Sequence, residues 1–257
     1  MPFDAERFRS QSRRSKPKLG RPLFYQAVTG STNDDALAAA RSGAPHGSLF
    51  VADEQTRGRG RRGNSWLAAP GENLLFSVLL RPQLELAQVS ALTLAIGLAL
   101  RDAVAPLVAQ ETQLKWPNDL YVGGKKLAGV LVESQLQGDR LQAVIVGVGL
   151  NVATQQFPEE LGARATSLAL LGAAQLQREP LLFDLLQAIA LRVEAYRAAG
   201  VAGILDELNA ADALRDRRIR VDALSGVGCG LDAQGCLLIR DDSGHTHAIS
   251  SGTVELL

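Results

Sequence analysis

The chain reads Arg57-Gly58-Arg59-Gly60-Arg61-Arg62-Gly63 between two short apolar stretches, Leu49–Ala52 and Leu74–Leu80. Both stretches predict strands, so the run between them, here called the arginine loop (Arg57–Gly63), is expected to be a loop. Glycine lets a backbone approach a ligand closely, and backbone amides together with fixed positive charges can surround an anion. The loop therefore predicts a site for a compact anionic ligand. A nucleic-acid contact is the competing interpretation, although no second basic stretch or aromatic series extends a binding track.

A second polar stretch reads Lys115-Trp116-Pro117-Asn118-Asp119-Leu120. Three of the chain's five lysines are Lys115, Lys125 and Lys126, in a sequence that contains 22 arginines. An ammonium is a compact point charge that can follow a moving anion. The clustering of lysines therefore favours a site that requires an ammonium rather than a guanidinium, with chance clustering as the alternative. The amide and the carboxylate after the proline could position phosphates, the carboxylate through Mg²⁺, or could serve only a turn.

Other polar residues could complete such a site. Gln55 offers an amide to a polar ligand head, and Trp66 could cover an apolar ligand or pack in the core. Ser31-Thr32-Asn33 precedes a predicted helix over Asp34–Arg41, so its hydroxyls could bind a ligand or cap the helix. Gly147-Val148-Gly149-Leu150-Asn151 closes an apolar strand. Its glycines imply that another group approaches the backbone closely, and a bulge with a turn asparagine is the alternative.

Composition excludes several classes of protein. Hydrophobic residues make up 46% and charged residues 21%, which is typical of a globular protein with a core. Lys+Arg and Asp+Glu both number 27, so no global field attracts nucleic acid or anionic lipid. The closest approach to a membrane span, Ala91–Leu100, is too short, so no membrane association is expected. The two cysteines, Cys229 and Cys236, are too few for a disulfide framework, which favours a cytoplasmic location.

The pattern divides the chain into three parts. Residues 1–22 are rich in arginine and serine and predict a flexible tail, with a mitochondrial transit peptide as the alternative. Residues 23–209 predict a mixed α+β domain with two long helices, Val89–Leu107 and Leu181–Ala199. Residues 210–257 hold short strand candidates punctuated by glycine, which predict a small β-barrel. The strands expected in the larger domain are Leu23–Val28, Leu49–Ala52, Leu74–Leu80, Lys126–Glu133 and Ala143–Leu150.

Taken together, these motifs closely resemble those of biotin protein ligases. No one of them is highly specific alone, whereas several of them in the family's order are. The resemblance runs from about residue 24 to the C-terminus. The matching segments are Ser31-Thr32-Asn33, Gly58-Arg59-Gly60-Arg61-Arg62-Gly63 with Trp66, Lys115-Trp116-Pro117-Asn118-Asp119-Leu120, Lys126-Leu127-Ala128-Gly129 and Gly147-Val148-Gly149-Leu150-Asn151.

The resemblance implies an α+β catalytic domain, similar in architecture to class II aminoacyl-tRNA synthetases, followed by a small SH3-like barrel. It also implies an enzyme that joins biotin and ATP, accompanied by Mg²⁺, into biotinyl-5′-AMP. The biotin would then pass to a lysine of the biotin carboxyl carrier protein of acetyl-CoA carboxylase or a related carboxylase. The nearest alternative is a lipoate or octanoate protein ligase, whose fold and acceptor are similar.

Carried over by position, the resemblance implies a role for each matching residue. Lys126, Arg61 and Arg59 would be catalytic, because they would neutralise the carboxylate and the α-phosphate. The biotin site would consist of Ser31, Thr32, Asn33, Gln55, Arg59, Gly60, Arg61, Trp66, Lys126 and Gly129. The adenylate would contact Arg61, Lys115, Asn118, Asp119 and Asn151, and Asp119 would also hold Mg²⁺.

The chain departs from the family pattern at both ends. Many bacterial members carry an N-terminal DNA-binding domain, but only about two dozen residues precede the catalytic pattern here, so no specific DNA binding is expected. Family members often finish with an arginine after the last strand, whereas this chain ends Val254-Glu255-Leu256-Leu257. A C-terminal contribution to ATP binding is therefore left open, as is the choice between monomer and homodimer.

Overall fold

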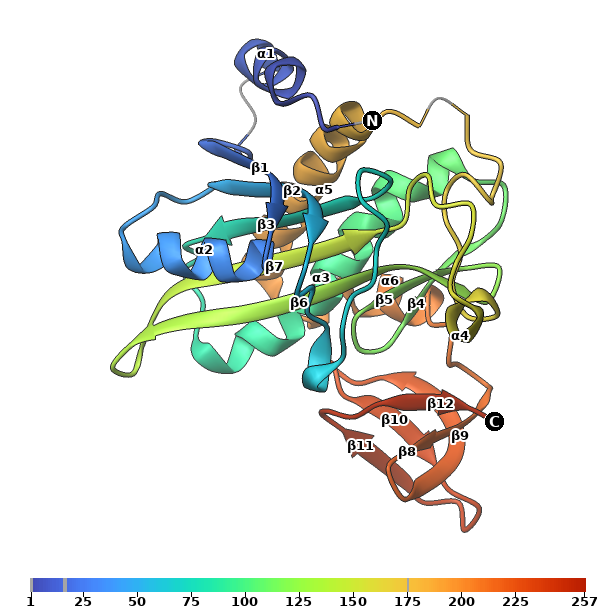
Figure 1. Cartoon of the computed structure of the whole chain (residues 1–257). Coiled ribbons are helices and arrows are strands. Elements are labelled where there is room, and N and C mark those ends of the chain that lie inside the picture. The colour runs from blue at the N-terminus through green and yellow to red at the C-terminus, as the bar shows by residue number, and fades with distance from the viewer. Residues whose placement is uncertain (1, 16–17, 175) are drawn as a thin grey trace.

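The computed structural model describes residues 2–15, 18–174 and 176–257 (Figure 1). Over these residues the main layer is a seven-stranded sheet of order β1-β2-β3-β7-β6-β5-β4. β1 and β2 are parallel, and the other neighbours are antiparallel. The expected strands of the larger domain are confirmed. The strands are β1 (Leu23–Thr29), β2 (Leu49–Gln55), β3 (Leu74–Leu80), β4 (Thr112–Lys115), β5 (Asp119–Val122), β6 (Lys125–Gln137) and β7 (Arg140–Leu150).

Two of these strands, β4 and β5, are not predicted from the sequence, and they hold the second polar motif. They pair antiparallel with Lys115 opposite Asp119, so residues 116–118 form the turn of a hairpin. Each strand has only four residues, and its side chains alternate between buried and half-buried positions. The hairpin therefore presents the lysine and the carboxylate together at one end of the sheet.

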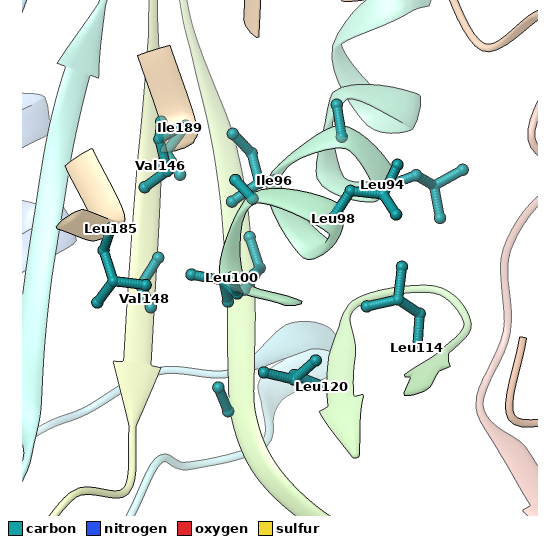
Figure 2. Packing of buried hydrophobic residues seen from close by; sticks show 14 of the residues in the cluster. Leu94, Ile96, Leu98, Leu100, Leu114, Leu120, Val146, Val148, Leu185 and Ile189 are labelled. Atoms are coloured by element: carbon teal, nitrogen blue, oxygen red, sulfur yellow. The ribbon is translucent and has the colours of Figure 1, made fainter. Parts of the chain in front are cut away.

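Helices cover both faces of the sheet (Figure 1). α3 (Leu86–Val104) and α5 (Arg178–Ala199) pack together on one face, where Val146 of β7 joins the main core (Figure 2). α2 (Thr32–Arg41) covers the other face and packs against Ile145 of the same strand. Successive residues of a strand point to opposite faces, so β7 contributes to both cores. Shorter elements are α4 (Glu159–Gly162), α6 (Leu205–Ala210) and the 3₁₀ turns Arg61–Gly63, Ala105–Leu107 and Ala202–Ile204.

The helix α3 is apolar along most of its length because it packs against both the sheet and α5. Within the described residues, Leu86–Leu107 is long and apolar enough to match a membrane span, by length and composition alone. In the structure, 61% of its most apolar window is buried inside the protein. The apolar character of this helix is therefore accounted for by its place in the core.

A second, five-stranded antiparallel sheet has the order β11-β10-β9-β8-β12 within the described residues. The segment that leads into it runs along the main sheet, because Leu114 of β4 exchanges backbone hydrogen bonds with Ala211 and Ala213 at 2.7 and 3.0 Å. The indole N–H of Trp116 also donates to the carbonyl of Gly235 at 3.0 Å. The strands are β8 (Arg218–Val221), β9 (Leu224–Leu231), β10 (Leu237–Arg240), β11 (Thr246–Ile249) and β12 (Val254–Leu256).

The N-terminal segment corrects an expectation. Residues 1–22 were predicted to be a flexible tail, but α1 (Ala5–Ser15) is a helix that packs beside α5, and Phe3 and Phe8 are buried in the main core. Two aromatic residues five positions apart do not form a helical apolar stripe, so local periodicity cannot predict this docking. Met1, Lys16 and Pro17 lie outside the described residues.

Candidate active site

A cavity lies where the arginine loop, the β4–β5 turn and the C-terminal sheet meet. The expected convergence of cationic groups from separate stretches is confirmed, because Arg59, Arg61 and Lys126 all line this one cavity. The predicted site residues that line it are Ser31, Thr32, Asn33, Gln55, Arg59, Gly60, Arg61, Trp66, Lys115, Asn118, Asp119, Lys126 and Gly129.

Positive charge exceeds negative charge at the centre of this cavity. The ammonium of Lys126 lies 2.7 Å from a carboxylate oxygen of Asp119. Burial lowers the pKa of Lys115 and of Arg61, while the Asp119 charge opposes both shifts. Three cations and one carboxylate thus share a cavity in partly desolvated positions, where an incoming anion interacts strongly with the cations. This arrangement can hold two anionic groups close together.

Arg59 lies on the cavity wall but is engaged by acids. Its guanidinium forms a two-pronged pair with Glu133 at 2.7 and 3.0 Å, and it lies 2.8 Å from Asp34. The amide of Asn33 donates to the same Glu133 carboxylate at 2.7 Å. These acids therefore tether the arginine loop to α2 and β6. Neither acid was singled out from the sequence, because pairing between residues 59 and 133 leaves no local pattern.

The start of α2 is organised by Gln55. Its side-chain oxygen accepts hydrogen bonds from the backbone N–H and the hydroxyl of Thr32, at 2.8 and 3.0 Å. Ser31 occupies the N-cap position of α2. Within this fully described helix, its hydroxyl makes no capping hydrogen bond. Since the Gln55 side chain accepts a hydrogen bond from a backbone N–H in the first turn of α2, as a capping side chain does, the Ser31 hydroxyl is not needed to cap the helix.

Trp66 forms one wall of the cavity by lying against two glycines. A methyl group added at Gly149 would collide with the Trp66 indole, and one added at Gly129 would meet the same ring at 3.0 Å. On the same strand a methyl group at Gly147 would collide with the amide of Asn33. The prediction that another group approaches the backbone closely at Gly147 and Gly149 is confirmed. Lys126 lies over the indole, with its ammonium 5.4 Å from the ring centroid.

Asn151 is the predicted site residue that does not line the cavity. It is buried, its side-chain amide donates to the carbonyl of Thr166 at 3.0 Å, and its backbone N–H donates to Leu127. It therefore fixes the segment after β7 against the start of β6. Its contact with a nucleotide stays a prediction.

The C-terminal sheet contributes residues that the sequence does not reveal. Gly252, Thr253 and Val254 line the cavity just before and at the start of β12. They carry no charged group, and only the packing of the two sheets brings them there. The C-terminal region therefore borders the site through its backbone and small side chains.

Metal-binding chemistry has a single candidate here. In the described part of the chain, no three His, Cys, Asp or Glu side chains come close enough together to hold an ion. One carboxylate, that of Asp119, faces the cavity. Mg²⁺ is commonly held by one or two carboxylates together with substrate phosphates, so this donor set fits a metal that arrives with a nucleotide.

Known proteins are similar to this chain in sequence. Residues 25–151 match the Biotin/lipoate A/B protein ligase family. The bifunctional ligase/repressor BirA of Bacillus subtilis is 34% identical over 244 residues, which cover 93% of this chain and 75% of that protein. The biotin–[acetyl-CoA-carboxylase] ligase of Mycobacterium tuberculosis is 39% identical, over 91% of this chain and 88% of that protein.

The chain belongs to the biotin protein ligase family.

Solved structures of biotin protein ligases share its fold. The biotin protein ligase from Aquifex aeolicus in complex with biotin and ATP superposes with a TM-score of 0.78. The two sequences are 30% identical, and the alignment covers 92% of this chain and 99% of that one. A large mixed sheet with helices, followed by a second antiparallel sheet, is therefore an arrangement shared with solved biotin protein ligases, which confirms the mixed-sheet part of the expected α+β fold.

Proposed function

We propose that this biotin protein ligase attaches biotin to a lysine of a biotin carboxyl carrier protein in two steps. In the first, the biotin carboxylate attacks the α-phosphate of ATP, which gives biotinyl-5′-AMP and releases pyrophosphate. In the second, the deprotonated acceptor amine attacks the acyl carbon of this mixed anhydride, so an amide bond forms and AMP leaves. The carrying observation is that Arg61, Lys115 and Lys126 line one cavity together with Asp119, which pairs with Lys126 at 2.7 Å.

Electrostatics explains why these cations are needed. A carboxylate and a triphosphate repel each other at bonding distance, so the protein must supply positive charge before the reaction begins. Lys126 would neutralise the oxygens on which charge builds, and Arg61 would bind the α-phosphate. No nucleophilic side chain is required, because the substrate carboxylate itself attacks the phosphorus.

The biotin end of the site consists of groups that bond a polar head and cover an apolar ring. Ser31, Thr32, Asn33 and Gln55 would bond the ureido group and position α2 around it. Trp66 and the flat strand surface at Gly129 and Gly149 would contact the rings. Arg59 would reach the carboxylate by exchanging its contacts with Glu133 and Asp34, whereas Gly60 lets the loop backbone lie close to the ligand.

The nucleotide end is assigned to the β4–β5 turn. Lys115, Asn118 and Asp119 would contact the adenylate, and Asn151 would support the segment beside it. Asp119 would hold Mg²⁺ together with the phosphates once Lys126 turns toward the reacting carboxylate. The metal would supply further positive charge to the triphosphate.

The finer organisation belongs to the same proposal. Residues 23–209 would form the catalytic domain, with the layout of class II aminoacyl-tRNA synthetases, and residues 210–257 an SH3-like barrel. Support comes from the five short antiparallel strands of the second sheet and from its position beside the cavity. The acceptor would be the carrier domain of a biotin-dependent carboxylase, in the cytoplasm.

The test is biotin-dependent exchange of labelled pyrophosphate into ATP by the purified protein, repeated with lipoate in place of biotin. We expect exchange with biotin, and tighter binding of biotin than of lipoate in isothermal titration. No exchange with biotin, or tighter binding of lipoate, would refute the assignment.

A further inference from the structure

A carboxyl group is buried outside the cavity, in the apolar strand β2. Asp53 lies 2.8 Å from the guanidinium of Arg178, and both side chains are about nine-tenths buried, at 10% and 8% exposed. The same carboxyl accepts hydrogen bonds from the Tyr25 hydroxyl at 2.6 Å and from the backbone N–H of Phe3 at 3.1 Å. Three segments far apart in sequence therefore meet at one side chain.

Burying such an ion pair costs free energy, because both charges lose their hydration. Removing two charges from water costs several kcal/mol per ion, and apolar residues of similar size often stabilise a fold as well or better. Arg178 also opens α5, where the helix dipole disfavours a positive charge. Asp53 offsets that disadvantage. A buried pair of this kind is most useful where it sets a geometry that apolar packing would leave loose.

The geometry in question is the base of the connection between β2 and β3, which carries the arginine loop. The carbonyl of Asp53 accepts from the N–H of Gly71 at 2.9 Å. Arg178 donates to the carbonyl of Asn73 at 3.1 Å. The two members of the pair thus hold the returning end of this connection, while Gln55, two residues after Asp53, marks its departing end.

The N-terminal arm, residues 2–15, covers this pair. The Phe3 ring lies 5.9 Å from the Arg178 guanidinium carbon and 5.8 Å from the Tyr25 ring. The backbone N–H of Asp4 donates to the Glu179 carboxylate at 2.7 Å. Burial and the bond to Asp53 raise the pKa of Tyr25 to about 12, so its hydroxyl keeps donating at any ordinary pH. Without the arm, water would reach the pair and one donor to Asp53 would be lost.

We propose that Asp53 and Arg178 are positioning residues of the ligase site, and that the N-terminal arm excludes water from this pair. Together they fix the base of the β2–β3 connection so that the arginine loop can close over the adenylate. This inference rests on the proposed function. It concerns retention of the intermediate rather than its chemistry, since neither residue lines the cavity.

The test compares Asp53→Asn with Asp102→Asn. Asp102 also pairs with an arginine of α5, Arg192 at 2.7 Å, but its bonds do not involve the β2–β3 connection. Wild-type and variant proteins would be loaded with biotin and ATP, and the release of biotinyl-adenylate followed under single-turnover conditions. Trypsin cleavage within the arginine loop would be timed on the same samples, and thermal unfolding would confirm that each is folded.

We expect Asp53→Asn to release adenylate about tenfold faster and to be cut faster in the loop, with a smaller change in the rate of adenylate formation. Asp102→Asn should alter neither release nor loop cleavage, even if its melting temperature falls equally. Phe3→Ala removes the ring that covers the Asp53–Arg178 pair and leaves both charged residues in place. It should also speed adenylate release, so it tests the proposal even if Asp53→Asn does not fold.

The outcomes separate the two proposals. A wild-type protein that forms no adenylate refutes the proposed function. A wild-type protein that forms and retains adenylate, alongside folded variants at Asp53 and Phe3 that release it at the wild-type rate, overturns this inference.

Discussion

Replacing Lys126 by alanine removes an ammonium that lies 2.7 Å from Asp119 and borders the cavity. The pair is partly exposed, and Lys115 and Arg61 remain near the carboxylate, so the free energy of unfolding should fall by only about 1 kcal/mol. The effect on the reaction should be much larger. A unit charge about 4 Å from a developing phosphate charge contributes up to about 4 kcal/mol at the effective dielectric of a partly buried site.

Loss of one such preorganised charge typically slows a reaction about 10²- to 10³-fold. The assay is biotin-dependent ATP–pyrophosphate exchange at saturating substrates, beside a thermal melt of each protein. Lys125→Ala is the matched control, because this neighbouring lysine is exposed and does not line the cavity. Exchange by Lys126→Ala within about threefold of the Lys125→Ala rate would refute the reasoning.

Three further predictions follow from individual contacts. Arg61→Ala should lose biotinyl-adenylate about tenfold faster into a filtrate, and stable retention would count against a clamp at this residue. Gly149→Ala should weaken biotin binding about tenfold in isothermal titration, because the added methyl group forces the Trp66 indole to shift; unchanged affinity would show that the ring does not form the biotin wall. Burial raises the pKa of Asp212 to about 6, above its usual 3.8, so its contribution to stability is full below about pH 3.8 and is lost as pH rises through about 6. Asp212→Asn should therefore raise the free energy of unfolding by about 1–2 kcal/mol near pH 7 and hardly at all near pH 4; equal melting temperatures of variant and wild type near pH 7 would contradict this.

Much of the site could be predicted because its residues lie in short motifs with unusual composition. The alternation of arginine with glycine, and the lysines at 115 and 126, stand out against the rest of the chain. Strands such as β3 and β7 are continuous apolar runs, since helices cover both of their faces, and such runs are easily found.

The missing parts share a different physical origin. β4 and β5 are four-residue strands that pair with each other, and β5 also pairs with β6, so their own side chains give only a weak signal. Phe3 and Phe8 dock through contacts with residues far along the chain. Likewise, Glu133 and Thr253 reach the site only after the sheets have formed. Local periodicity carries no information on such long-range contacts.

The most direct measurement of the central claim is a crystal structure of the protein soaked with biotin and ATP. We predict a single biotinyl-adenylate in the cavity, with the Lys126 ammonium and the Arg61 guanidinium within about 3 Å of its phosphate or carboxyl oxygens. A phosphate bound elsewhere, with Lys126 still paired to Asp119 and Arg61 turned to solvent, would contradict the claim that these cations bring the two anions together.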